Sequence, residues 1–165
     1  MNPFVVIMGV SGCGKTTIAN RLAEELDGTY LEGDSFHTEK NKEKMGSGTP
    51  LTDRDRWPWF DNLIGAARSE VDHELTPVLS CSALKEKYRE YLFADFDDCR
   101  LVYLKGNLDL VKSRMDERDH EYMTSTLLKS QYKTLQEPQP GPQTLIISIE
   151  ESPDVIVSTI IEWLD

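Results

Sequence analysis

The fold of this chain is decided by one stretch near its start, Gly9-Val10-Ser11-Gly12-Cys13-Gly14-Lys15-Thr16. Its spacing, G-x-x-x-x-G-K-[ST], is typical of a loop whose backbone N–H groups surround phosphate oxygens. Residues 4–8 before it are apolar and rich in β-branched side chains, which predicts a short buried strand. Ile18, Leu22 and Leu26 after it recur at helical spacing. A loop between a strand and a helix is the context in which this pattern binds a nucleoside triphosphate.

The loop is predicted to hold phosphates through its backbone and one lysine. Glycines let the backbone curl, and the following helix adds partial positive charge at its N-terminus. Lys15 is expected to reach the β- and γ-phosphates, and the Thr16 hydroxyl to bind Mg²⁺. Cys13 at this helix N-terminus is expected to have a lowered thiol pKa, so its alkylation should block activity. The predicted nucleotide-binding residues are Gly9, Val10, Ser11, Gly12, Cys13, Gly14, Lys15, Thr16 and Thr17. The alternative is a Gly-rich turn that matches the motif by chance. In that case the strand pattern before it and the helix pattern after it would also be coincidences.

Composition limits the possible partners. The chain has 165 residues, of which 39% are hydrophobic and 28% charged, as expected for one domain with its own core. A formal net charge of −11 argues against nucleic acid and anionic lipid as partners, although clustered Arg and Lys can still attract a small anion. The apolar run at the N-terminus is too short for a signal peptide or a membrane span. The three cysteines show no C-x-x-C pairing, which favours reduced thiols and a cytoplasmic location.

Strand and helix patterns alternate along the chain. Further strands are predicted at 29–31, 77–79, 100–104 and 145–149, and helices at 57–71, 84–93, 108–118, 126–135 and 153–164. The fold class is therefore α/β, with a five-stranded parallel sheet flanked by helices in one domain over residues 1–165. Residues 35–55 are polar without a long apolar period, which suggests a segment that covers the substrate within about 35–70. Residues 116–122 are dense in charge, as in a mobile lid over about 114–126.

Asp34 is the best candidate acid at the reacting end of the sheet. Many P-loop proteins place an Asp after the third strand, but residues 78–82 (Val-Leu-Ser-Cys-Ser) contain none. Asp34 ends the second predicted strand, where ligands of such sheets gather. It could bind Mg²⁺ through water, together with Thr16, or accept the proton of an attacking hydroxyl. The equally weighted alternative is a helix cap or an ordinary loop acid.

Several cations could bind an anionic substrate or the transferred phosphate. Arg56, beside two tryptophans, could fork onto a carboxylate, or it could belong to an ion-pair cluster at a helix start. Lys85 and Arg89 lie one helical turn apart and could face one anion, as could Arg114 and Arg118 next to the predicted lid. Solvent-exposed helix charges are the alternative for both pairs. His37, three residues after Asp34, is a further candidate for contact with the substrate.

The chain resembles the gluconokinases, small P-loop kinases related to shikimate and adenylate kinases. The match rests on residues 8–16, on 33–37 (Gly-Asp-Ser-Phe-His) with Asn41, Lys44, Met45 and Gly48, on 50–59 (Pro-Leu-Thr-Asp-Arg-Asp-Arg-Trp-Pro-Trp), and on 81–85 with Tyr88 and Arg89. Weaker support comes from Ser130-Gln131-Tyr132 and from residues 135–138, and together these blocks span nearly the whole chain in the family's order. The resemblance implies ATP- and Mg²⁺-dependent phosphorylation of D-gluconate at its 6-hydroxyl, and family members are often homodimers.

The resemblance also implies roles for individual residues. It places Asp34 at the acceptor hydroxyl, and it places His37, Arg56, Lys85 and Arg89 around the sugar acid. Lys15, Arg114 and Arg118 would act at the phosphates, under a closing lid. Thr38 and His120-Glu121 depart from the family pattern, the latter within the lid.

Two other functions are compatible with a phosphate loop. A shikimate kinase would be expected to have Asp at position 32, where this chain has Glu32, and a Gly-rich turn after the third strand. A nucleotide-dependent switch would hydrolyse ATP or GTP without an acceptor. The guanine signature N-K-x-D is not supplied by Asn107-Leu108-Asp109. Dependence on gluconate separates these alternatives.

Overall fold

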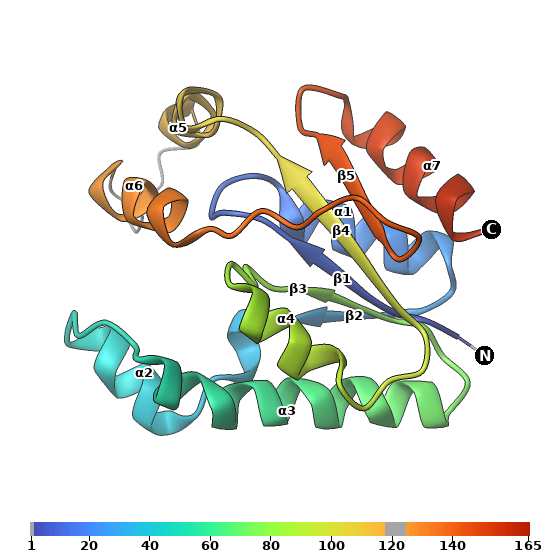
Figure 1. Cartoon of the computed structure of the whole chain (residues 1–165), viewed down its shortest axis with the longest axis horizontal. Helices are drawn as coiled ribbons and strands as arrows, with labels where there is room; N and C mark the ends of the chain where they lie inside the picture. The colour runs from blue at the N-terminus through green and yellow to red at the C-terminus, as the bar shows by residue number, and fades with distance from the viewer. Residues whose placement is uncertain (1, 118–124) are drawn as a thin grey trace.

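The computed structural model of this chain describes residues 2–117 and 125–165. Its centre is a five-stranded parallel sheet in the order β2-β3-β1-β4-β5 (Figure 1). The strands are β1 (Phe4–Met8), β2 (Thr29–Glu32), β3 (Pro77–Ser80), β4 (Cys99–Lys105) and β5 (Thr144–Ser148). The predicted α/β class and five-stranded parallel sheet are confirmed.

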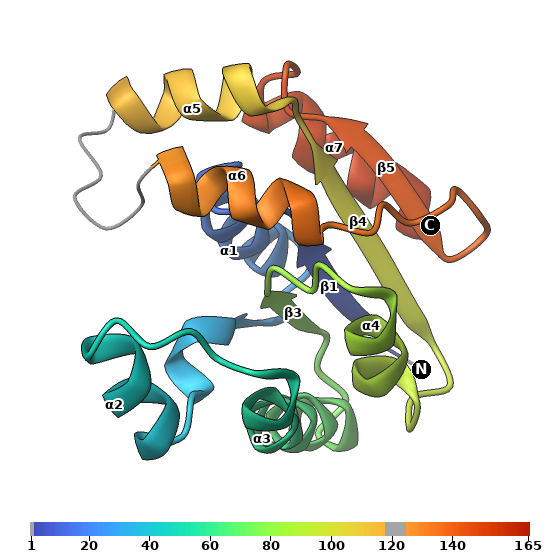
Figure 2. The ribbon, with the colours of Figure 1, turned by 60° about the vertical axis from the view of Figure 1, so that its left-hand side comes forward.

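Both faces of the sheet are covered by helices, which explains the continuous apolar sequence of β1. Val5 and Ile7 point to one side, where Leu22 of α1 (Lys15–Glu25) and Ile160 of α7 (Pro153–Leu164) pack. Phe4, Val6 and Met8 point to the other side, against α3 (Asp53–Asp72) and α4 (Glu86–Phe93). Figure 2 shows these layers on either side of the strands. A strand that is buried on both faces needs apolar residues at every position.

The segment between β2 and α3 contains more helix than its sequence pattern indicates. The 3₁₀ helix η1 (Gly33–Phe36) follows β2 directly, and α2 (Glu39–Gly46) follows it. The Thr38 hydroxyl caps α2 by accepting from the Asn41 backbone N–H at 3.1 Å. Helix α3 begins four residues before the predicted start, because Thr52 and Asp55 form a reciprocal capping box. The sequence pattern indicates no helix within 35–55, because this segment lacks a long apolar period.

Two further helices, α5 (Leu108–Glu117) and α6 (Ser125–Thr134), complete the structure. Together with α2, they lie at the end of the sheet toward which the strand arrows point (Figure 1). Of the predicted lid over 114–126, residues 118–124 lie outside the described ranges. No helix in those ranges is long and apolar enough to cross a membrane.

Candidate active site

A cavity of about 660 Å³ opens at the carboxyl ends of the strands. Its wall combines the loop after β1, η1, the start of α3, the segment after β3 and one face of α6. It brings together nine of the predicted site residues: Ser11, Gly12, Gly14, Lys15, Thr16, Thr17, Asp34, His37 and Arg56. One space therefore joins the phosphate loop to the predicted acid and arginine.

The phosphate loop has the backbone conformation that its glycines permit. Gly14 precedes α1 with φ 98°, and Gly12 has φ 82°, a region that other residues rarely adopt. A Cβ atom on Gly12 would lie 2.6 Å from Met115 Cγ. Lys15 Nζ donates to the Val10 carbonyl at 3.0 Å, so its ammonium lies against the loop. Gly9, Val10 and Cys13 are not among the cavity-lining residues, although they belong to the loop.

Cys13 differs from its predicted chemistry. Only 4% of the residue is exposed, and it packs in the core cluster beneath the loop. Burial raises the pKa of the Cys13 thiol, and the opposing effects of Lys15 and its backbone are smaller. The prediction of a lowered thiol pKa is therefore wrong, because desolvation of the thiolate outweighs the helix N-terminus.

Gln131 of α6 contacts the phosphate loop, and the sequence did not single it out as a functional residue. Its Oε1 accepts from the Ser11 backbone N–H at 2.7 Å, and its Nε2 donates to Ser11 Oγ at 3.0 Å. Both residues line the cavity. The two bonds join the loop to a helix 120 positions further along the chain, and no local sequence pattern could have indicated this pairing.

Glu32 is a second functional candidate without a role in the sequence prediction. It ends β2, and its carboxylate accepts from the Thr16 hydroxyl at 3.2 Å, from the Ser80 hydroxyl at 3.3 Å and from the Tyr30 hydroxyl. Ser80 ends the neighbouring strand β3. The sequence did offer one signal for Glu32, because it is an acid at the end of a parallel strand, where ligands of such sheets gather. The carboxylate lies beside the hydroxyl that is expected to bind Mg²⁺.

Asp34 lies in η1 and His37 directly follows it, and both residues line the same cavity. Asp34 is exposed to it. The His37 ring stacks on Trp59 with centroids 4.0 Å apart, and Trp59 Nε1 donates to the Gly33 carbonyl at 2.8 Å. Burial lowers the pKa of His37, partly opposed by Asp34, so the ring is neutral near pH 7. A neutral imidazole can donate or accept a hydrogen bond with a substrate hydroxyl.

Arg56 projects from the first turns of α3 into the cavity wall. Its Nη1 donates to the Leu51 carbonyl at 2.9 Å, and its guanidinium lies 5.5 Å from the centre of the Tyr88 ring. The aromatic neighbour that holds the arginine is thus Tyr88, whereas the sequence had suggested the nearby tryptophans. A guanidinium held in this way keeps donors available for a planar carboxylate.

Three further predicted cations, Lys85, Arg89 and Arg114, are not among the residues that line the cavity. Lys85 pairs with Asp53 at 3.2 Å. Arg89 is buried and donates to the carbonyls of Ala83, Leu84 and Gln136. Arg114 donates to the Ile149 carbonyl at 2.6 Å, and Arg118 lies outside the described residues. The structure does not bring Lys85, Arg89 or Arg114 to the cavity with the other predicted residues.

Sequence comparison extends the match over almost the entire chain. A family model described as an AAA domain matches residues 4–138. The thermoresistant gluconokinase of Escherichia coli is 37% identical over 95% of this chain and 90% of its own length. The gluconokinase of Gluconobacter oxydans is 40% identical over 96% and 89%. The chain belongs to the gluconokinase family. The resemblance inferred from its motifs is thereby confirmed.

Solved structures agree with this family assignment. A gluconokinase from Sinorhizobium meliloti superposes with a TM-score of 0.87 at 34% identity, covering 98% of this chain and 91% of that protein. A sugar kinase from Janibacter superposes with a TM-score of 0.90 at 36% identity, covering 100% and 95%. An APS kinase from Mycobacterium tuberculosis, with a TM-score of 0.72 at 18% identity, shares the fold. This chain is therefore a P-loop kinase in fold and a gluconokinase in family.

Proposed function

We propose that this protein transfers the γ-phosphoryl group of ATP to the 6-hydroxyl of D-gluconate, giving 6-phosphogluconate and ADP. The observation that carries the proposal is the shared cavity, in which Lys15 of the phosphate loop and Arg56 line one space. A sugar acid bound by its carboxylate at Arg56 would have its far end free to approach the loop. The gluconokinase names of the relatives support the choice of acceptor.

Mg²⁺ fits the residues around Thr16. This ion is usually held by one or two carboxylates, substrate phosphates and water, without a complete protein cage. No group of three or more His, Cys, Asp and Glu side chains in the described part of the chain forms such a cage. Thr16, Glu32 and Asp34 instead supply oxygen atoms on the cavity wall. When bound, the ion would neutralise charge on the phosphates. Thr16 would bind it directly, and Glu32 and Asp34 would accept hydrogen bonds from the water molecules that coordinate it.

Asp34 has the position of a group that orients the acceptor. It is exposed and lines the same cavity as the phosphate loop and His37. There its carboxylate would accept the hydrogen of the 6-hydroxyl and direct the oxygen at the phosphate, while Lys15 binds the transferred group. A positioned base of this kind typically accelerates a reaction by about 10²–10⁴-fold. Arg114 and Arg118 remain predicted phosphate contacts, to be tested by substitution.

A coupled assay of ADP release tests the function. Purified protein with ATP and Mg²⁺ is assayed with gluconate, with shikimate and without acceptor. We expect strong stimulation by gluconate alone, because a kinase site should hydrolyse ATP slowly without its acceptor. Stimulation by shikimate, or equal ADP release in all three reactions, would contradict the proposal and favour a shikimate-kinase-like enzyme or an acceptor-independent switch.

Assembly and cellular location are further proposals. The family resemblance suggests a homodimer, which sedimentation velocity of the purified protein would reveal as a species of twice the mass of 18.8 kDa. Three free, buried cysteines agree with a reducing compartment such as the cytoplasm.

A further inference from the structure

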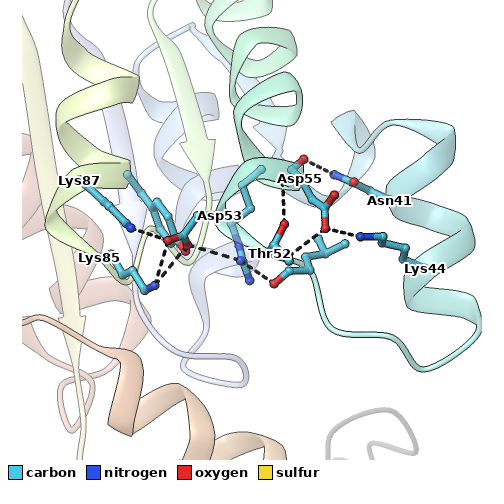
Figure 3. Close-up of polar contacts among 10 residues, drawn as sticks. Asn41, Lys44, Thr52, Asp53, Asp55, Lys85 and Lys87 are labelled. Atoms are coloured by element: carbon cyan, nitrogen blue, oxygen red, sulfur yellow. Dashed lines mark hydrogen bonds and ion pairs between the residues drawn. The ribbon is translucent and has the colours of Figure 1, made fainter.

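The carboxylate of Asp53 collects polar side chains from two helices. Asp53 is the first residue of α3, and Lys85, Lys87 and Tyr88 lie at the start of α4. Lys85 Nζ lies 3.2 and 3.5 Å from the two carboxylate oxygens, and Lys87 Nζ and the Tyr88 hydroxyl also donate to them. Figure 3 shows the two lysines converging on Asp53. One side chain thus joins the beginnings of both helices.

Asp53 contacts two residues of the cavity wall but does not line the cavity itself. Arg56 and Tyr88 line the cavity, whereas Asp53, Lys85 and Lys87 are not among its lining residues. The nearest contact of Arg56 Nη1 with the Asp53 carboxylate is 3.9 Å, at the outer limit of an ion pair. The lysines approach the same carboxylate more closely. Arg56 is therefore near its counter-ion without being its principal partner.

The side chains around Asp53 carry more positive than negative charge, and this excess positive charge can attract an anion. Arg56, Lys85 and Lys87 carry three positive charges around one carboxylate. Hydrogen bonds from Lys87 and Tyr88 hold the pKa of Asp53 well below its usual range, so it is ionised at physiological pH. If Asp53 lost its lysine partners, Arg56 would be the remaining cation for it to attract. Pairing of Arg56 with Asp53 would remove donors from the cavity.

We propose that Asp53 is a positioning residue for the sugar acid: held by Lys85 and Lys87, it fixes Arg56 and Tyr88 in the cavity wall without neutralising Arg56. This role rests on the proposed function, because it assigns the substrate carboxylate to Arg56. It also gives Lys85 an indirect part in binding, through Asp53, in place of the direct contact expected from the sequence.

Asp53→Asn tests the role with a nearly unchanged side-chain shape. Gluconate and ATP dissociation constants are measured separately by calorimetry, with Asp154→Asn as a matched control in an ion pair on α7. We expect gluconate binding to weaken about tenfold and ATP binding to change by less than about twofold, because Arg56 and Tyr88 are displaced while the phosphate loop keeps its own contacts. Unchanged or tighter gluconate binding would overturn the proposal. Equal weakening for both ligands with a lowered melting temperature would also overturn it, by making Asp53 merely structural.

Lys87→Met provides a second test that leaves the cavity residues in place. Lys87 is half exposed, so its replacement should be tolerated by the fold. We expect gluconate affinity to fall about threefold to tenfold, because Asp53 then pairs more closely with Arg56. In an Asp53→Asn background the same change should have no further effect. An equal effect in both backgrounds would contradict coupling through Asp53.

Gluconate binding and ADP release measured on the wild-type protein distinguish a failure of this proposal from a failure of the proposed function. If gluconate neither binds to the wild type nor stimulates ADP release, the assignment of the substrate is wrong, and the role of Asp53 is overturned with it. If the wild type responds to gluconate and Asp53→Asn binds it equally well, only the role of Asp53 is wrong.

Discussion

Gln131 and Ser11 form a two-point contact between α6 and the phosphate loop: Oε1 accepts from the Ser11 backbone N–H at 2.7 Å, and Nε2 donates to Ser11 Oγ at 3.0 Å. The loop is thereby fixed by a helix that also lines the cavity. The contact links α6, the helix that follows the predicted lid in the sequence, to the phosphate loop. Loop geometry therefore depends on a residue outside the phosphate-binding motif.

Substitution of Gln131 should affect ATP more than gluconate. Gln131→Ala is expected to weaken ATP binding by about fivefold to tenfold, because the Ser11 segment loses two hydrogen bonds. Gln131→Glu keeps an acceptor oxygen for the Ser11 backbone N–H, but it replaces the Nε2 donor with a second acceptor and adds a negative charge near the triphosphate, and we expect it to weaken ATP binding further. Calorimetric titration with a non-hydrolysable ATP analogue measures both effects, with exposed Lys133→Ala on α6 as the control. Unchanged affinity in both variants would exclude the role.

Replacement of Arg56 should affect the opposite ligand. Arg56→Lys retains the charge but cannot form the planar two-donor contact with a carboxylate. We expect KM for gluconate to rise about tenfold or more and KM for ATP to change by less than about twofold. Steady-state kinetics with each substrate varied in turn give both values. An unchanged KM for gluconate would remove Arg56 from the sugar-acid site.

His37 should make folding stability dependent on pH. Its folded-state pKa lies below the ordinary value of 6.5, so the unfolded chain binds more protons between these two values. The contribution of His37 to stability therefore rises with pH through this window, is complete above about pH 6.5, and is lost as pH falls through the folded pKa. Melting temperatures between pH 5 and 7.5 should show a smaller pH dependence in His37→Asn than in the wild type. Parallel curves for the two proteins would contradict the assignment.

The cysteines should be unreactive in the folded protein. Burial raises the pKa of Cys13, that of Cys81 to about 12 and that of Cys99 to about 11. Since the thiolate is the reactive form, alkylation by iodoacetamide at pH 7.5 should be slow in the native state and complete in denaturant. Mass spectrometry of peptides from timed samples measures each site. Rapid native labelling of Cys13, prevented by ATP, would instead support the low-pKa thiol that its position in the sequence indicates.

Arg89 should contribute to stability more than to binding. Its guanidinium satisfies three backbone carbonyls beside α4, one of them from Gln136 before β5. Arg89→Met is expected to destabilise the fold by about 2–4 kcal/mol, because the carbonyls of Ala83 and Gln136 lose the guanidinium as their partner. Urea unfolding measures the loss. At temperatures where the variant is folded, KM for gluconate should match the wild type, whereas a large increase in KM with little loss of stability would restore Arg89 to the substrate site.

The sheet was predictable because its sequence pattern follows directly from burial. Residues 4–8 are apolar at every position, and the strand they form is covered on both faces. The start of α3 was missed because it depends on side-chain caps from Thr52 and Asp55. Helix α2 was missed because it is polar, with Asn41 as its only buried residue. Local polar bonding determined these elements more than apolar periodicity did.

The candidate site was predictable where its residues belong to a recognisable sequence motif. Lys15, Thr16, Asp34, His37 and Arg56 are such residues, and the cavity contains all of them. Gln131, Glu32 and Asp53 act through partners far away in sequence, and a charge pattern cannot show which partner a side chain chooses. Arg89 and Cys13 are the converse cases, because burial in the folded chain overrides what their local sequence suggests.

The central claim is phosphoryl transfer within one cavity, and ³¹P NMR of the reaction mixture tests it most directly. Protein, ATP, Mg²⁺ and D-gluconate are incubated, and spectra are compared with a reaction that lacks gluconate. We predict a phosphomonoester signal that appears with ADP and couples to the two protons of a terminal CH₂ group, as phosphorylation at the 6-hydroxyl requires. Release of inorganic phosphate alone, at the same rate with and without gluconate, would contradict the account.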